Sequence, residues 1–202
     1  MFLKVSTIFL IVLVTHILYS EAAKSVTSAD IKKKITAANA NKYIGIGGRY
    51  GRLVDTVSKD RIIESDHFPP KSVYSYAKDK HIREINERDM GAVSISYAEH
   101  RTLLTTGSAN EKGGFMNQWL ADHFKKGEYY QAIEKNIQLY VEAKFLNQIK
   151  KGVMDALEVH VANKLITDAQ RKTLIKQFSL DTYDKNFEKD KDRTEAFKVV
   201  HA

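Results

Sequence analysis

The stretch Glu64-Ser65-Asp66-His67-Phe68-Pro69-Pro70 joins a predicted strand to a turn. The β-branched residues of Arg61-Ile62-Ile63 immediately before it favour extended backbone. The two prolines forbid a continued helix and end any central strand, because proline fixes φ and has no N–H to donate. We therefore expect a strand that delivers Asp66 and His67 into a tight turn. Because side chains alternate along a strand, these two residues point to opposite sides.

A second strand and a helix are predicted after Gly91. Residues 92–97 alternate apolar and polar side chains with period two, which is the pattern of a half-buried strand. Ser96 stands three residues before Glu99, the spacing of a capping box at a helix N-terminus. His100 then falls on the first turn of this helix. The connection from the first strand is long enough to fold back and bring His100 to Asp66 and His67.

Phosphodiester hydrolysis suits this set of residue types. The reaction needs a group that takes a proton from water, a divalent cation that neutralises phosphate charge, and stabilisation of the departing oxygen. One member of the Asp66-His67 pair can face the cation while the other faces the attacking water. His100 would complete the protein ligands, which requires the side chains of Asp66 and His100 to lie within about 7 Å of each other.

The segment resembles the HNH, or ββα-metal, nuclease superfamily, in particular the DHxPP-containing toxin domains of secreted bacterial effectors. The resemblance spans roughly residues 61–108 and rests on Asp66-His67-x-Pro69-Pro70, on Met90-x-Ala92-Val93-x-Ile95, and on His100-Arg101 followed by Thr105-Thr106-Gly107-Ser108. It implies that Asp66 and His100 are metal ligands and that His67 is the general base. It also implies a nucleic-acid substrate and a divalent metal ion as cofactor.

The chain departs from the family pattern at several positions. Asn86 is the candidate for the middle Asn of the family name. Phe68 stands where the members compared have Ile, and Gly91 where they have Pro. Cysteine is absent, so disulfides and thiolate zinc sites are excluded. A metal must then be held by His, Asp, Glu or Asn, which favours Mg²⁺ or Mn²⁺, or Zn²⁺ through imidazole.

The same residues are also compatible with ordinary structural roles. Lys71 and Arg101 adjoin the site and are candidate substrate-binding residues for flanking phosphates, although solvation at the surface also accounts for Lys71. His67 and His100 can be ordinary hydrogen-bonded histidines. In that case the chain is a secreted, non-enzymatic binding protein that retains an inactive nuclease-like fold. Aromatic residues near Tyr140 are explained by base stacking or by helix packing, and His160 has no partner at a recognisable spacing.

The N-terminus predicts export. Met1-Phe2-Leu3-Lys4 is a cationic start, residues 5–18 are mainly apolar, and Ser20-Glu21-Ala22-Ala23 offers small residues for cleavage after Ala22 or Ala23. The apolar run is shorter than the roughly 20 residues that span a bilayer. We therefore expect a signal peptide over residues 1–22, secretion to the extracellular space, and no stable membrane anchor after cleavage.

The net charge indicates the kind of partner, and the length indicates the number of domains. The formal net charge is +7, and it stays the same after cleavage because one Lys and one Glu are lost. A diffuse positive charge suits an anionic partner such as nucleic acid or a membrane surface. A protein inhibitor is a further partner that the sequence leaves open. The mature chain of about 180 residues has room for one core, which predicts one main domain.

We expect an α+β fold, a small ββα-metal finger with additional C-terminal helices. Residues 24–59 form a lead-in with a glycine-rich, loosely ordered or hairpin segment, and residues 60–110 form the HNH-like core. Residues 111–180 extend this domain with helices, interrupted at Gly127 and Gly152. Residues 181–202 are a charged tail, frayed over residues 181–193 because they contain few apolar side chains.

Overall fold

The structure, a computed structural model, describes residues 25–105 and 111–202. The predicted signal peptide, residues 1–22, and the Thr106-Gly107-Ser108 part of the nuclease-like pattern lie outside the described residues. Within the described part the chain is an α+β protein, mostly helical, with a three-stranded antiparallel sheet. No helix in this part is both long enough and apolar enough to cross a membrane.

The sheet and the short helices around it come first in the chain. The strands are β1 (Gly47–Arg49), β2 (Ile63–His67) and β3 (Gly91–Ser96). The helical elements of this half are α2 (Ser28–Lys34), η1 (Ala37–Lys42), α3 (Tyr50–Thr56), α4 (Lys71–Tyr74), α5 (Lys80–Arg83), η2 (Glu87–Asp89) and α6 (Tyr97–Thr102).

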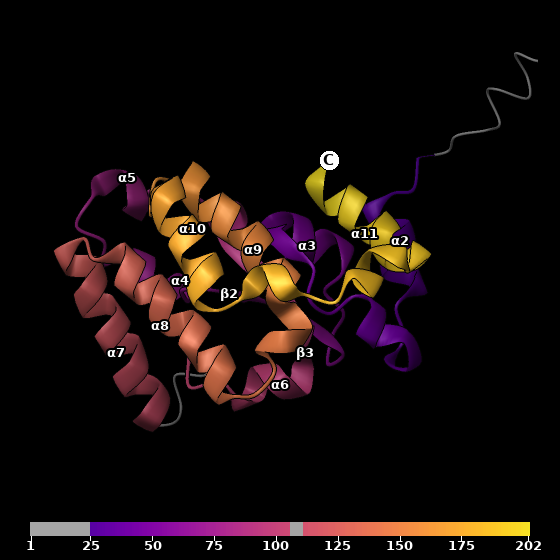
Figure 1. Ribbon diagram of the computed structural model, residues 1–202, viewed down its shortest axis with the longest axis horizontal. Coiled ribbons are helices and arrows are strands. Elements are labelled where there is room, and N and C mark those ends of the chain that lie inside the picture. The colour runs from indigo at the N-terminus through magenta and orange to yellow at the C-terminus, as the bar shows by residue number, and fades with distance from the viewer. Residues whose placement is uncertain (1–24, 106–110) are drawn as a thin grey trace, which may run out of the picture.

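The second half is helical, and most of its elements are longer than those of the first half. They are α7 (Glu111–Lys126), α8 (Tyr129–Glu142), α9 (Leu146–Ala162), α10 (Asp168–Gln177), η3 (Leu180–Thr182), η4 (Lys185–Lys189) and α11 (Lys191–His201). Figure 1 shows α7 and α8 at one end of the long axis and α2 and α11 at the other, with α9 between them. The chain therefore returns to its N-terminal elements at its end.

The sheet separates two hydrophobic cores. β3 is the central strand and pairs with β2 so that Asp66 lies opposite Val93 and His67 opposite Ala92. Val93 belongs to the core shared with α7, α8 and α9, whereas Ala92 belongs to the core shared with α2, α3 and α11. β3 is covered on both faces, so residues 91–95 are all buried. The half-buried strand predicted here is in fact a fully buried one.

Glycines let α9 lie directly on the strands. A Cβ added to Gly47 would come within 1.8 Å of the Gly152 carbonyl oxygen, and one added to Gly91 would come within 2.5 Å of the His160 ring. Gly152 thus lies inside α9, and the predicted break at this position is wrong. The helix tolerates this glycine because its missing side chain makes room for the sheet. Gly127 does end α7, with a φ of 80°.

Two segments are more ordered than their composition indicates. The glycine-rich residues 43–52 form β1 and the start of α3, because pairing with β3 supplies the hydrogen bonds that a loose connection lacks. Residues 181–202, expected as a charged tail, form η3, η4 and α11. Phe187, Ala196 and Val200 are buried in the core next to α2 and α3. A few well-spaced apolar residues are sufficient to dock this segment.

The predicted helix cap at Ser96 is confirmed, and a second cap of the same kind starts α10. Ser96 and Glu99 form a capping box at the start of α6. Thr167 and Gln170 form another at the start of α10. In both cases the side chains satisfy N–H groups that lack partners in the first turn. The cap at Ser96 also fixes the direction in which α6 leaves β3, and this direction sets the position of His100.

Candidate active site

Asp66 and His100 are brought together by the end of β2 and the first turns of α6. The Oδ1 atom of Asp66 lies 3.2 Å from Nε2 of His100. Asp66 is only 6 % exposed, so its carboxylate is shielded from water on most sides. The two side chains are therefore close enough to be ligands of one cation, as the sequence predicts.

A buried tyrosine holds the other oxygen of Asp66. The hydroxyl of Tyr140, on α8, donates a hydrogen bond of 2.7 Å to Oδ2. Burial of Tyr140, together with the nearby charge of Asp66, raises its pKa well above the ordinary value, so the hydroxyl keeps its proton. Tyr140 therefore packs in the core and orients Asp66 so that Oδ1 faces His100.

Glu64 contacts the opposite side of the His100 ring. Its carboxylate lies against Nδ1, while Asp66 faces Nε2. Burial on its own lowers the pKa of His100, but the hydrogen bond and charge of Asp66 and the charge of Glu64 outweigh it and raise that pKa. Arg101 donates to both oxygens of Glu64, at 2.7 and 2.6 Å. The ring is thus fixed from two directions; in a metal-ligating histidine such a partner is found on the ring nitrogen that does not bind the metal.

His67 lies on the other face of β2, as the strand alternation predicts. Its ring stacks on Tyr50 of α3 with the ring centroids 3.7 Å apart. Its Nε2 atom is buried and has no hydrogen-bond partner among the described residues. Burial lowers the pKa of His67 to about 4, although the charges of Asp66 and Glu87 oppose this shift. The ring is therefore neutral at neutral pH, which is the form that accepts a proton.

His160 supports the backbone directly after His67. Its Nε2 atom donates to the carbonyl oxygen of Phe68 at 2.6 Å, and the two rings meet edge to face. The roles of His160 and Tyr140 at the site were not predicted from the sequence. These residues stand 92 and 74 positions from their partners, and no spacing rule joins residues so far apart. Only the packing of α9 against the sheet, and of α8 on α9, brings them to the site.

A cavity of about 850 Å³ opens over this cluster. Asp66, His67 and His100 line it, and so do the candidate substrate-binding residues Arg101 and Lys71. Both of these cations are already paired, Arg101 with Glu64 and Lys71 with Glu87 at 2.6 Å. Their charge is therefore partly neutralised before any substrate arrives.

Asn86 takes a structural role and does not line this cavity. Its side chain accepts a hydrogen bond from the backbone N–H of Arg88 and caps the short helix η2. The cavity wall does not include it. The candidate for the middle Asn of the nuclease family is thus not brought to Asp66 and His100.

Two side chains fit a divalent cation, and a third does not join them. Ligand atoms that each lie about 2.0–2.2 Å from one cation are roughly 3 Å apart, which matches Oδ1 of Asp66 and Nε2 of His100. Glu64 lies on the far nitrogen of the ring, so it cannot share that cation. Accordingly, among the described residues no group of three His, Asp or Glu side chains converges on a metal position.

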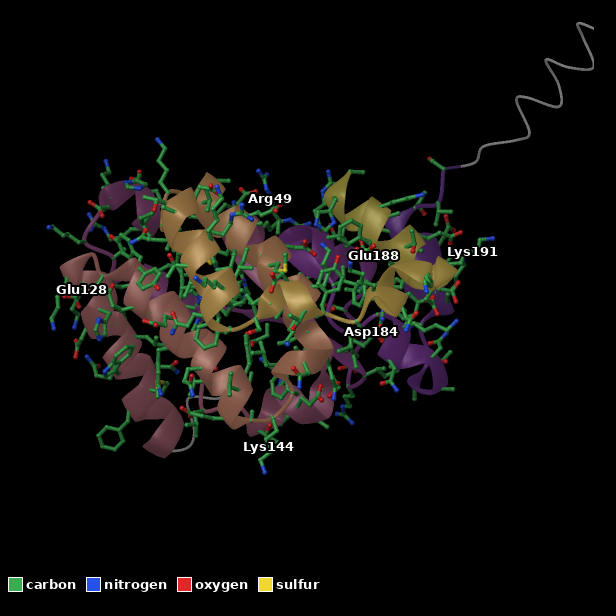
Figure 2. All side chains as sticks on the ribbon, viewed as in Figure 1. Arg49, Glu128, Lys144, Asp184, Glu188 and Lys191 are labelled. Carbon is green, nitrogen blue, oxygen red and sulfur yellow. The ribbon has the colours of Figure 1, made fainter. Side chains whose placement is uncertain are left out.

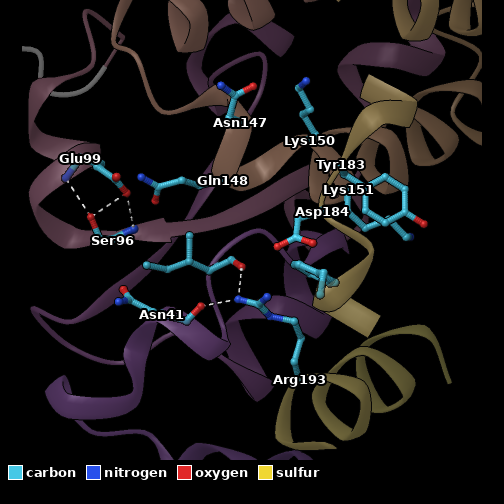
Figure 3. Close-up of a pocket in the computed structure, with 12 residues that line it drawn as sticks. Asn41, Ser96, Glu99, Asn147, Gln148, Lys150, Lys151, Tyr183, Asp184 and Arg193 are labelled. Carbon is cyan, nitrogen blue, oxygen red and sulfur yellow. Dashed lines mark hydrogen bonds between the residues drawn. The ribbon is translucent and has the colours of Figure 1, made fainter. Parts of the chain in front are cut away.

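A second cavity, of about 600 Å³, lies between the start of α9 and the C-terminal segment. Figure 3 shows its polar side chains, but most are engaged with the protein itself: Glu99 caps α6, and Arg193 donates to the backbone carbonyls of Asn41 and Ile44. Lys151 pairs with Asp155. The buried imidazole nitrogen of His67 and the paired side chains of Asp66 and His100 belong to the first cavity, which makes it the stronger candidate site.

Surface charge gives little further guidance. Figure 2 shows nitrogen and oxygen atoms interspersed over the molecule, with Glu128, Lys144 and Lys191 at its outer edge. No face dominated by one sign of charge stands out in this view. No protein-family model, curated protein or solved structure gives a significant match to this chain.

Proposed function

We propose that the chain is a metal-dependent nuclease that hydrolyses phosphodiester bonds of DNA or RNA. The observation that carries the proposal is the 3.2 Å approach of Asp66 and His100 in one cavity with His67, which lies on the other face of the same strand. The order β2, β3, α6 supports a ββα-metal finger built from these three elements. Asp66 and His100 would hold a divalent cation, Mg²⁺ or Mn²⁺ or, through imidazole, Zn²⁺, which supplies charge neutralisation at the phosphate when bound.

The residues of the chain divide the remaining work. The neutral imidazole of His67, which lines the cavity, accepts a proton from the attacking water, whose oxygen bonds to phosphorus as the bond to the leaving oxygen breaks. The leaving oxygen takes a proton from solvent. Glu64 and Tyr140 orient His100 and Asp66, and His160 holds the backbone that carries His67. Arg101 and Lys71 would bind substrate phosphates once their ion pairs with Glu64 and Glu87 break.

Export is part of the proposal and rests on residues 1–23 of the sequence alone. A secreted nuclease with this site acts as a toxin, an effector or a digestive enzyme. An inhibitor protein is the partner expected for a toxin.

The test is degradation of plasmid DNA and total RNA by the purified chain with Mg²⁺, Mn²⁺ or Zn²⁺, with and without EDTA. His67→Ala is expected to abolish cleavage. His81→Ala is the matched control, because His81 is exposed on α5 and does not line the cavity. Equal cleavage by both variants, or cleavage that survives EDTA, would overturn the proposal.

A secreted binding protein is the second candidate function. The observation that favours it is the exposed aromatic pair on α7, where Phe115 is 79 % and Trp119 40 % exposed. Neighbouring exposed aromatic residues are typical of surfaces that contact a partner. This candidate predicts that His67→Ala leaves biological activity intact and that Phe115→Ser with Trp119→Ser removes it.

A further inference from the structure

Four cationic side chains line the cavity over Asp66 and His67, and they fall into two pairs. Lys71 and Arg101 are held by the carboxylates of Glu87 and Glu64. Lys32 and Lys59 lie on the side of the cavity formed by α2, α3 and the turn before β2. No carboxylate of a described residue forms an ion pair with either of these two.

Lys32 is half-buried and its ammonium group is fixed in place. The Nζ atom donates to the carbonyl oxygen of Val54 at 2.9 Å, in the last turn of α3. This bond caps the helix end and uses one of the three N–H groups of the ammonium. Two N–H groups remain for another acceptor. A half-buried ammonium group whose hydrogen-bond partner is a neutral carbonyl leaves its charge uncompensated and is therefore suited to bind an anion.

Lys59 is also half-buried, and its backbone is fixed by a tight turn. Its N–H donates to the carbonyl of Ile63, and its carbonyl accepts from Ile62 and Ile63, all at 2.9 Å. Next to it, the hydroxyls of Ser58 and Ser65 hydrogen-bond each other at 2.6 Å and line the same cavity. Ammonium and hydroxyl groups together are the donors that proteins direct at phosphate oxygens.

The strand alternation connects these groups to the candidate active site. Ser65 and His67 lie on the same face of β2, two residues apart, and β2 is an edge strand of the sheet. A ligand that follows the outer edge of β2 from His67 passes Ser65 and then reaches Lys59. Asp60, the acidic residue nearest to Lys59 in sequence, is exposed at the rim of the cavity and makes no ion pair with a described residue.

We propose that Lys32 and Lys59, with Ser58 and Ser65, form a phosphate subsite for a nucleic-acid strand that continues past the bond to be cleaved. The inference deepens the proposed nuclease function and rests on it. The substrate is then a polynucleotide, and a single phosphodiester does not fill the site. The subsite also defines on which side of Asp66 and His67 the strand continues, because these two lysines lie on one side of them.

The experiment measures binding apart from cleavage. Labelled single-stranded DNA and RNA oligonucleotides are titrated by fluorescence anisotropy against His67→Ala protein in EDTA, at several salt concentrations. In the same background, Lys32→Gln with Lys59→Gln is expected to weaken binding and to lower the slope of log K against log salt by about 1.5, since each lost phosphate contact contributes about 0.7–0.9. Lys32→Arg with Lys59→Arg is expected to keep the slope.

Lys176→Gln with Lys189→Gln is the matched control, because both lysines are exposed and lie outside the cavity. A slope that falls equally in the two glutamine pairs overturns the subsite, and so does competition by poly-glutamate as strong as that by the oligonucleotide. These outcomes are separate from the nuclease test. If the chain cleaves nucleic acid but Lys32 and Lys59 have no special role in binding, the nuclease proposal stands and the subsite proposal is wrong. If the chain binds nucleic acid through these lysines but does not cleave it, the subsite proposal stands and the nuclease proposal is wrong.

Discussion

Tyr140 and Asp66 meet in the interior, where the tyrosine hydroxyl donates to the carboxylate at 2.7 Å. The contact joins the helical half of the chain to the end of strand β2. It gives a buried carboxylate a neutral donor and leaves its other oxygen facing His100. A core residue thus determines the orientation of a candidate metal ligand.

Replacing Tyr140 with Phe removes this donor and little else. We expect the free energy of unfolding to fall by about 1–3 kcal/mol, because a buried acceptor loses its partner. Under the nuclease proposal, affinity for Mn²⁺ also falls, by roughly 10–100-fold. Urea denaturation and calorimetric titration with Mn²⁺ measure the two effects. Tyr130→Phe is the control, since the Tyr130 hydroxyl makes no hydrogen bond with a described residue, and an equal loss in both variants would contradict the assigned role.

Glu64→Gln tests whether the contact with Nδ1 of His100 matters for the site. The amide keeps the shape of the side chain but loses its charge and accepts through one oxygen only. We expect affinity for Mn²⁺ to fall about 10–100-fold. Asp60→Asn removes a carboxylate from the rim of the same cavity and is expected to change affinity far less. If Asp60→Asn had the larger effect, simple loss of negative charge would explain both results.

Gly91→Ala places a methyl group where His160 already lies. The added Cβ would stand 2.5 Å from Cε1 of His160 and 3.0 Å from the carbonyl oxygen of Ala156. We expect a loss of about 1–3 kcal/mol of stability, measured by thermal and urea denaturation. Gly114→Ala on α7 is the opposite case, because nothing lies within 4 Å of its Cβ position. Replacing a glycine within a helix by alanine stabilises the folded chain by roughly 0.5–1 kcal/mol, so a loss of stability in this variant would contradict the prediction.

His160 makes stability depend on pH. Burial lowers the pKa of His160 to about 4 in the folded chain, whereas the unfolded value is near 6.5. Between these values the unfolded chain binds a proton that the folded chain does not, so stability falls as pH drops from 6.5 towards 4. The full effect is about 3 kcal/mol. Urea denaturation at pH 7 and 4.5 should show a smaller difference for His160→Gln than for the unaltered chain, and an equal difference would contradict the assignment.

Local signals in the sequence are sufficient for several elements. The prolines after Phe68 end β2, the Ser96–Glu99 pair starts α6, and Thr167 starts α10. Each of these signals acts on residues only a few positions away in the sequence. The sequence is less informative where packing overrides composition. Gly152 lies within α9 since the sheet backbone is there to meet it, and the charged C-terminal segment is ordered by the burial of Phe187 and Val200.

In the candidate site, too, some features follow from local patterns and others from long-range packing. Local patterns were enough to predict that Asp66 and His67 leave a strand on opposite faces and that His100 lies on the first turn of a capped helix, because strand alternation and capping act over a few residues. Long-range packing was needed to reveal that Tyr140 and His160 support the site and that Glu64 holds Arg101 and His100. It also places Lys32 and Lys59 beside them, without a carboxylate partner among the described residues. These contacts join residues far apart in the chain. Their positions depend on how α9 packs against the sheet, how α8 packs on α7 and α9, and how α2 packs on α3 and α11, which no pattern within one segment encodes.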